Sequence, residues 1–234
     1  ADRPHIIFSI TKSMAALLVG ALVGRGRLNP QDLVTDYLPE LAGSAYDGAR
    51  LRHLLDMQVA SGFSENYTDT DGIFMAYRRA AAWNPVEEGV ETEGLRHFLK
   101  QMPKSDTAQH GRLHHYCSPH SDVLGWVIER AGNASFAEQF SEHILAPCGG
   151  SHTGYITLDT YGAPRVSGGM CLGLYDLLLI GEMVRNRGYI NQLQVVPSAW
   201  IDDITAVRDN SIWRAQHNAD GPRLFTTGNY RSLW

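Results

Sequence analysis

Apolar residues recur at helical spacing along most of the chain, whereas the alternation of apolar and polar residues that is typical of half-buried strands is scarce. The most apolar run, from Thr11 to Gly24, predicts a helix that is buried on most sides and ends at glycine. Further helices are expected over residues 31–38, 51–57, 73–83, 92–102, 121–131, 135–145, 174–187 and 197–204. The polar stretch from Ser105 to His115 contains Gly111 and predicts a loop. The visible pattern is therefore that of a mainly helical protein.

Composition and charge indicate a globular protein and argue against some classes of partner. A chain of 234 residues forms one large domain or two small ones, and a hydrophobic content of 44% is sufficient for a packed core. The formal charge of -5 and the lack of a basic run argue against a nucleic-acid partner. The most apolar stretch is too short to span a membrane. Three cysteines are too few for a disulfide framework, so free thiols are expected, which favours a reducing compartment.

The first candidate for chemistry is an S-x-x-K motif, formed by Ser9 and Lys12 at the start of the apolar helix. Residues three apart on a helix share a face, so the Lys12 amine should reach the Ser9 hydroxyl. The free N–H groups and the positive dipole end of a helix start favour a developing negative charge. Apolar residues after Lys12 should bury its side chain, and burial favours the neutral amine that accepts a proton. The alternative is that Ser9 only caps the helix and Lys12 is solvated.

The second candidate is a Y-x-S pattern, formed by Tyr116 and Ser118 between the polar loop and the next helix. A tyrosine placed against a cationic lysine can act as a base or an acid. Ser118 can bond the nucleophile or the lysine, and it can also cap a helix that begins near Ser121. The alternative interpretation of Tyr116 is a core aromatic residue that precedes a helix cap.

Taken together, these two motifs resemble those of a known enzyme superfamily. The segment Phe8-Ser9-Ile10-Thr11-Lys12-Ser13, combined with Tyr-Cys-Ser-Pro-His-Ser-Asp-Val-Leu-Gly-Trp at 116–126, resembles the serine β-lactamase and penicillin-binding-protein superfamily. Within it, the chain is most similar to the 6-aminohexanoate-dimer hydrolases, which are related to class C β-lactamases and carboxylesterases. Residues 54–57, 167–170 and 176–183 agree with the same subgroup. The resemblance extends over nearly the whole chain.

The resemblance implies a mechanism and a set of site residues. Ser9 would attack a carbonyl carbon, and Lys12 and Tyr116 would accept its proton and pass it to the leaving group. The backbone N–H of Ser9 would provide half of an oxyanion hole, and water would release the acyl-enzyme. Tyr67 matches a tyrosine that bonds the leaving nitrogen in amide-cleaving members; the alternative is an exposed loop aromatic. Tyr67 and Ser118 are therefore the expected substrate-binding residues. The chemistry requires no cofactor and no metal.

The chain departs from the superfamily pattern at the third motif, which is a Lys-Thr-Gly-like segment on a strand. Thr226-Thr227-Gly228 is similar, but residues 229–234 look more like the stretch that leads into that strand. We therefore expect residues 1–234 to be an internal fragment of one β-lactamase-related catalytic domain. The expected fold is α+β and β-lactamase/transpeptidase-like, with the helical region present and most of the antiparallel sheet missing. Such a fragment leaves apolar surface uncovered and can lack activity on its own.

The sequence also contains weaker signals for other functions. His110 and His114 have a zinc-like spacing, but no glutamate follows His110 and Gly111 disfavours a helix, so a metal site is not expected. The expected function is a serine hydrolase that cleaves a small amide or ester. The alternative is a penicillin-binding or sensor-type protein that is acylated without turnover. A homodimer is left open, as is localisation, because the subgroup favours the cytoplasm whereas β-lactamases are exported.

Overall fold

The computed structural model describes residues 3–85, 89, 92–150, 154–206, 211–217 and 228–234. Its helices are α1 (Ile10–Gly24), α2 (Val34–Tyr37), α3 (Leu51–Leu55), α4 (Ile73–Ala80), α5 (Gly94–Lys100), α6 (Ser118–Gly132), α7 (Phe136–Phe140), α8 (Leu174–Arg185), α9 (Ser198–Thr205) and α10 (Ser211–His217), with the short helices η1 (Pro39–Leu41) and η2 (Ser141–Leu145). Its strands are β1 (His5–Ile6), β2 (Tyr155–Ile156), β3 (Met170–Leu172), β4 (Tyr189–Ile190) and β5 (Leu193–Gln194). As predicted, helices dominate.

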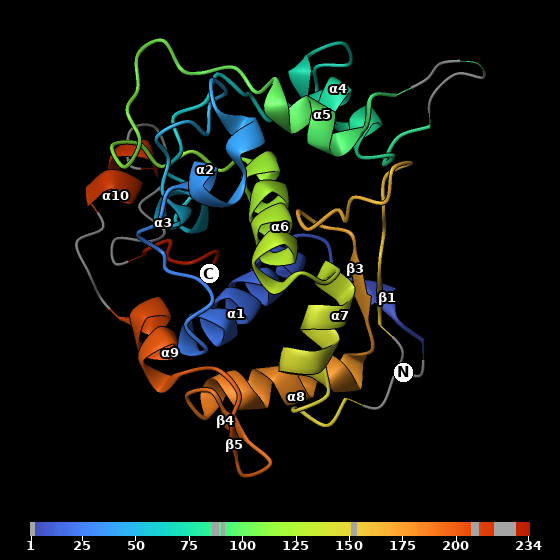
Figure 1. The fold of residues 1–234 in the computed structure, drawn as a ribbon, viewed down its shortest axis with the longest axis vertical. Coiled ribbons are helices and arrows are strands. Elements are labelled where there is room, and N and C mark those ends of the chain that lie inside the picture. The colour runs from blue at the N-terminus through green and yellow to red at the C-terminus, as the bar shows by residue number, and fades with distance from the viewer. Residues whose placement is uncertain (1–2, 86–88, 90–91, 151–153, 207–210, 218–227) are drawn as a thin grey trace.

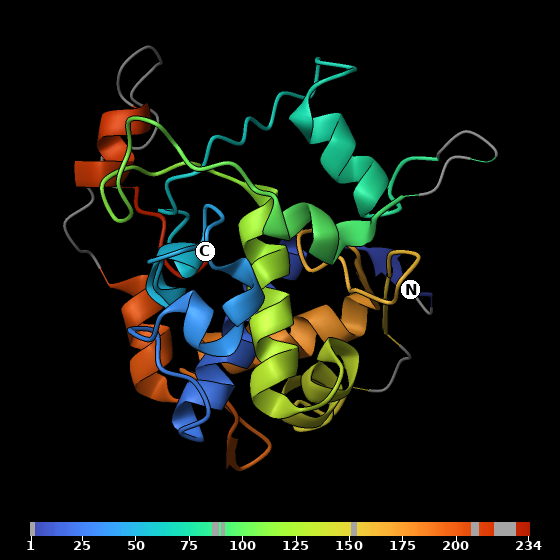
Figure 2. The ribbon, with the colours of Figure 1, turned by 45° about the horizontal axis from the view of Figure 1, so that its top comes forward.

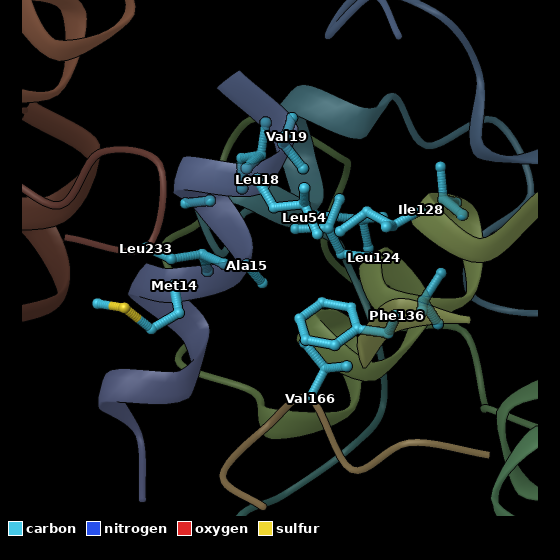
Figure 3. Packing of buried hydrophobic residues seen from close by; sticks show 14 of the residues in the cluster. Met14, Ala15, Leu18, Val19, Leu54, Leu124, Ile128, Phe136, Val166 and Leu233 are labelled. Atoms are coloured by element: carbon cyan, nitrogen blue, oxygen red, sulfur yellow. The ribbon is translucent and has the colours of Figure 1, made fainter. Parts of the chain in front are cut away.

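Helix α1 lies at the centre and is packed by α6 and its neighbours (Figures 1 and 2). Figure 3 shows side chains of α1 meeting residues of α3, α6 and α7 in one core, which includes Met14, Ala15, Leu18, Val19, Leu54, Leu124, Ile128, Phe136, Val166 and Leu233. On another side of α1, a Cβ atom at Gly20 would lie only 2.4 Å from the Trp200 ring, so glycine allows α9 to pack directly on the helix. The nucleophile candidate Ser9 is therefore followed directly by a largely buried helix.

A small sheet fixes where α1 begins. β3 pairs antiparallel with β1 on one side and with β2 on the other, with His5 opposite Leu172 and Tyr155 opposite Cys171. The Ile7 N–H continues this pairing by donating to the Met170 carbonyl at 2.9 Å. The turn before β3 is thereby held beside the start of α1. A separate hairpin joins β4 and β5.

Several local predictions are confirmed and one is wrong. Ser135 caps α7, because its side chain accepts from the Glu138 N–H and the Glu138 carboxylate bonds back to Ser135. The cysteines are free thiols, and all are buried. However, α6 begins at Ser118 instead of near Ser121, with Cys117 at its N-cap position, so Ser118 is not the cap. Pro119 does not delay the helix, because the first turn needs no N–H from proline. Helix α10 and η1 were not predicted.

Candidate active site around Ser9

Ser9 stands at the N-cap position of α1, but its side chain makes no capping hydrogen bond. Its backbone is already helical, with φ -64° and ψ -11°, and the side chain is exposed. Two other groups approach its hydroxyl oxygen. Lys12 Nζ donates to Ser9 Oγ at 3.2 Å, and the Tyr116 hydroxyl donates to it at 2.9 Å. The interpretation of Ser9 as a simple helix cap is therefore wrong in this structure.

The turn before Ser9 is strained. Phe8 has a φ of 44°, which is unusual for a bulky residue and costs on the order of 1–3 kcal/mol. The Phe8 carbonyl accepts the Thr11 N–H at 2.9 Å, so the strained residue also starts the hydrogen bonding of α1. The chain thus bends sharply between β1 and α1. This bend presents the Ser9 hydroxyl at the exposed end of a buried helix.

Lys12 is almost completely buried, with 1% of its surface exposed. Besides Ser9, its ammonium group donates to the carbonyl oxygen of Ser167, and it lies 5.1 Å from the centre of the Tyr116 ring. No carboxylate among the described residues forms an ion pair with it. The Lys12 Nζ atom is thus held between the Ser9 hydroxyl and the Ser167 carbonyl, within hydrogen-bond distance of both.

Tyr116 reaches Ser9 from the loop that precedes α6. The His115 N–H donates to the Met57 carbonyl at 2.8 Å, which fixes the backbone next to the tyrosine. The Tyr230 ring meets the Tyr116 ring edge to face, with centroids 6.4 Å apart, and also packs on His114. Burial raises the pKa of the Tyr230 phenol, so this neighbour stays neutral. The Tyr116 ring is thus held between Tyr230 and the Lys12 ammonium.

A buried network supports the Ser167 carbonyl that holds Lys12. Asp122 of α6 accepts the Ser167 N–H at 2.7 Å and the Tyr77 hydroxyl at 2.5 Å, and the Tyr77 oxygen lies 2.6 Å from Ser167 Oγ. Burial raises the pKa of Asp122 to about 6, while the Tyr77 hydrogen bond and the charges of Arg165 and Lys12 oppose the rise. Asp122 belongs to the segment 116–126 that carries the family resemblance, but the sequence alone assigned it no role.

The two expected substrate-binding residues meet at a carboxylate that sequence reasoning missed. Glu65 accepts the Ser118 N–H at 2.8 Å, the Ser118 hydroxyl at 2.9 Å and the Tyr67 hydroxyl at 2.5 Å. Ser118 therefore bonds Glu65, and the expectation that it bonds Ser9 or Lys12 is wrong. Tyr67 is 69% exposed, and its ring lies 4.7 Å from that of Phe74. Partial burial of the Tyr67 hydroxyl, followed by its hydrogen bond to Glu65, raises the pKa of the phenol, so the phenol stays neutral and its oxygen can accept a further hydrogen bond.

Other candidate features lie outside this cluster. His110 Nδ1 accepts the Ala60 N–H at 3.0 Å, and its Nε2 lies 3.1 Å from the Asp47 carbonyl oxygen. The described residues contain no group of three or more metal-binding side chains. Within the same part of the chain, every helix is too short or too polar to cross a membrane. The similarity to a third motif at Thr226 and Thr227 lies outside the described residues.

Comparisons with known proteins are consistent with this arrangement. A family model described as Beta-lactamase matches residues 1–170. The curated 6-aminohexanoate-dimer hydrolase of Paenarthrobacter ureafaciens is 29% identical over 233 residues, covering 100% of this chain and 58% of the relative. The chain therefore spans little more than half the length of this relative.

Solved structures share the fold. A putative 6-aminohexanoate-dimer hydrolase from Bacillus anthracis has a TM-score of 0.82 at 22% identity, with 100% of this chain and 58% of that chain covered. The octameric penicillin-binding protein homologue from Pyrococcus abyssi has a TM-score of 0.72 at 19% identity, with 99% of this chain and 53% of that chain covered. These similarities establish the architecture of the chain.

Proposed function

Because this chain belongs to the β-lactamase family, we propose that it carries the nucleophile and the bases of a serine hydrolase that cleaves a small amide or ester. One observation carries the proposal. Ser9 Oγ is contacted by both Lys12 Nζ, at 3.2 Å, and the Tyr116 hydroxyl, at 2.9 Å. A serine hydroxyl is a weak nucleophile until a neighbouring group takes its proton. Here two proton-exchanging groups lie within reach of one exposed serine.

The reaction follows from these contacts. Ser9 Oγ attacks the substrate carbonyl carbon while its proton passes to Lys12 Nζ, directly or through Tyr116. The oxyanion forms next to the N-terminus of α1, where the Ser9 N–H is free of backbone acceptors among the described residues. The C–N or C–O bond then breaks as Tyr116 gives its proton to the leaving group and takes the Ser9-derived proton back from Lys12. Water attacks the resulting ester of Ser9 by the reverse sequence of proton transfers and releases the acid.

The substrate is proposed to be a linear amide or ester, with amides favoured by Tyr67. The 6-aminohexanoate-dimer hydrolase of Paenarthrobacter ureafaciens, a relative of 29% identity, carries the name of a linear amide substrate. In this chain the Tyr67 phenol is exposed and donates its proton to Glu65, so its oxygen can accept from the N–H of a leaving nitrogen. An ester oxygen has no proton to offer, so this contact favours amides.

We also propose that the chain is an internal part of a longer catalytic domain. It covers 58% of its 29%-identical relative, and its larger described sheet has strands of only two or three residues. Leu158 and Leu174, on either side of β3 in sequence, are 52% and 59% exposed. Large apolar side chains at this exposure are expected where further strands cover them.

The test measures whether an acyl-enzyme forms on Ser9 and how long it persists. The full-length protein is mixed with 4-nitrophenyl acetate, and intact mass and peptide masses are followed over time beside a Ser9→Ala variant. Under the proposal, a 42-dalton acetyl adduct appears on the peptide that contains Ser9, decays as acetate is released, and is absent from the variant. An adduct that persists would indicate a sensor-type protein that is acylated without turnover. If Ser9 in the folded protein stays unmodified, the proposal fails.

A further inference from the structure

The main chain of Ser167, in the turn before β3, is held by side chains alone. Its N–H donates to Asp122 at 2.7 Å and its carbonyl accepts from Lys12, whereas neither group bonds another backbone group within the described part of the chain. Gly168 and Gly169 follow it and add little stiffness, because glycine restricts the backbone least. The position of the carbonyl that meets Lys12 therefore depends on the side chains that bind Ser167.

Tyr77 of α4 is the second side chain that fixes this residue. Its hydroxyl donates to Asp122 at 2.5 Å. A phenol has one proton to give, so in the 2.6 Å contact between the Tyr77 and Ser167 side-chain oxygens the Ser167 hydroxyl is the donor. The Tyr77 ring is fully buried and meets the rings of Phe63 and Phe98, with centroids 5.8 Å and 5.7 Å away. A well-packed phenol thus orients both the carboxylate and Ser167.

The carboxylate in this network is unfavourable for stability at neutral pH. Asp122 is 3% exposed, and burial raises its pKa to about 6. A group that is harder to ionise in the folded protein than in water destabilises the folded state once it is charged. Buried groups of this kind are typical of functional sites, which need a fixed hydrogen-bond acceptor at one place. Here that place is the contact between Ser167 and Lys12.

We propose that Tyr77 and Asp122 are positioning residues for the proton acceptor of the reaction. They hold the Ser167 carbonyl, and this carbonyl keeps Lys12 Nζ beside the Ser9 hydroxyl. The inference rests on the proposed hydrolase function. Lys12 Nζ donates both to Ser9 Oγ, at 3.2 Å, and to the Ser167 carbonyl, so a displaced carbonyl changes how the amine faces Ser9. Proton transfer depends on that alignment.

The test removes only the hydroxyl of Tyr77. Tyr77→Phe keeps the buried ring but takes away the group that links Asp122 to the Ser167 side chain. For hydrolysis of 4-nitrophenyl acetate by the full-length protein, kcat is expected to fall by about tenfold to a hundredfold, the range for a hydrogen bond to a charged group, with KM unchanged. A second readout is the nuclear magnetic resonance of isotope-labelled lysine. The Lys12 Cε and Nζ signals, assigned by their absence from Lys12→Ala, should move in Tyr77→Phe.

Tyr46→Phe is the matched control. Tyr46 is also fully buried, and its hydroxyl lies 3.4 Å from Nδ1 of His120, on the same helix as Asp122. Its loss should leave kcat, KM and the Lys12 signals unchanged. If both phenylalanine variants lower kcat by the same factor, a general loss of stability accounts for the effect and the inference is overturned. A Tyr77→Phe protein with the kcat and Lys12 signals of the wild type also overturns it.

A second variant decides the matter if Tyr77→Phe does not fold. Ser167→Ala keeps the carbonyl that meets Lys12 and removes only the hydroxyl that bonds Tyr77. Loss of this uncharged hydrogen bond is expected to lower kcat by about twofold to tenfold at unchanged KM and to move the Lys12 signals. Wild-type kcat and signals in Ser167→Ala would contradict the inference.

Failure of the proposed function is recognised separately. If the folded wild-type protein shows no turnover that depends on Ser9, the hydrolase proposal fails whatever the variants do. The Lys12 signals still test the contact in that case. Signals that move in Tyr77→Phe and stay in Tyr46→Phe support the positioning of Lys12, and signals that stay in both variants exclude it.

Discussion

Helices α1 and α8 differ in how completely their apolar side chains are buried. In α1, the side chains of Leu17 and Leu18 are fully buried, and even Lys12 is 1% exposed. In α8, which follows the sheet, Leu174 and Leu178 lie on one face and are 59% and 62% exposed. Figure 1 shows α8 at the end of the molecule opposite the α4–α5 pair. Most of α1 is buried, whereas α8 presents an apolar face to the surface.

The candidate site depends on both sides of the molecule. Lys12 of α1 and Asp122 of α6 both bond Ser167, which lies in the turn before β3. Ser9 and its neighbours are therefore held together by helices, by the loop that carries Tyr116 and by the turn before β3.

The largest expected effect is from Lys12→Ala, which removes the buried amine next to Ser9. General acid–base groups contribute about a hundredfold to ten-thousandfold, so kcat should fall by that factor with little change in KM. Steady-state kinetics on the full-length protein measure this. Lys100→Ala, at an exposed position of α5, is the control and should keep full activity. A Lys12→Ala variant of equal activity would remove lysine from the mechanism.

The comparison of the two regions is tested directly by truncating one leucine in each. Leu17→Ala should cost about 2–5 kcal/mol in free energy of unfolding, because it opens a cavity in a filled core. Leu178→Ala should change the stability of this chain by less than about 0.5 kcal/mol. Denaturant unfolding measures both. In the full-length protein the Leu178→Ala cost should rise if further strands cover α8; an equal, small cost in both proteins would contradict the proposal of a missing sheet.

A smaller effect is expected from Tyr67→Phe, which removes the exposed hydroxyl that Glu65 orients. Loss of one hydrogen bond to the leaving nitrogen should lower kcat/KM for an anilide by about tenfold. The rate for the matched 4-nitrophenyl ester should change little, since an ester oxygen has no proton to donate. Tyr189→Phe, at an exposed position on β4, is the control. Equal losses on both substrates would show that Tyr67 does not distinguish amides.

The smallest effect concerns the pH dependence of stability. The pKa of Asp122 is about 6 in the folded protein against 3.8 in its ordinary state, so the folded state binds more protons between these values. The contribution of Asp122 is therefore most favourable below about pH 4, and stability is lost as the pH rises towards about 6. Asp122→Asn should make this part of the profile flatter. Thermal unfolding between pH 3.5 and pH 7 measures the slope; an identical slope in both proteins would contradict the assignment.

Much of the helical region was predictable from sequence because its signals are local. The apolar run of α1 is a continuous segment, and Ser9 and Lys12 are only three residues apart. The structure forms the predicted helix and places Lys12 Nζ next to Ser9 Oγ. The resemblance to the β-lactamase superfamily, and with it the α+β fold, is confirmed by the family match. The position of Tyr116 beside Ser9 followed from that resemblance, because the two residues are 107 apart in sequence.

The supporting residues were not predictable because their partners are distant in sequence. Asp122 meets Ser167 across 45 residues, Ser118 meets Glu65 across 53, and Lys12 meets the Ser167 carbonyl across 155. No periodic pattern encodes such pairings. The wrong interpretation of Ser118 has the same cause, since its hydroxyl was assigned to the nearest expected partners while Glu65 lies in a separate loop.

The central claim is that Ser9 is an activated nucleophile, and labelling with a fluorophosphonate probe tests it most directly. Full-length protein, Ser9→Ala and the control Ser13→Ala are incubated with the probe, and the modified residue is identified by peptide mass spectrometry. The account predicts labelling at Ser9 in the wild type and in Ser13→Ala, and none in Ser9→Ala. A folded wild-type protein that remains unlabelled at Ser9, or is labelled equally in Ser9→Ala, would contradict it.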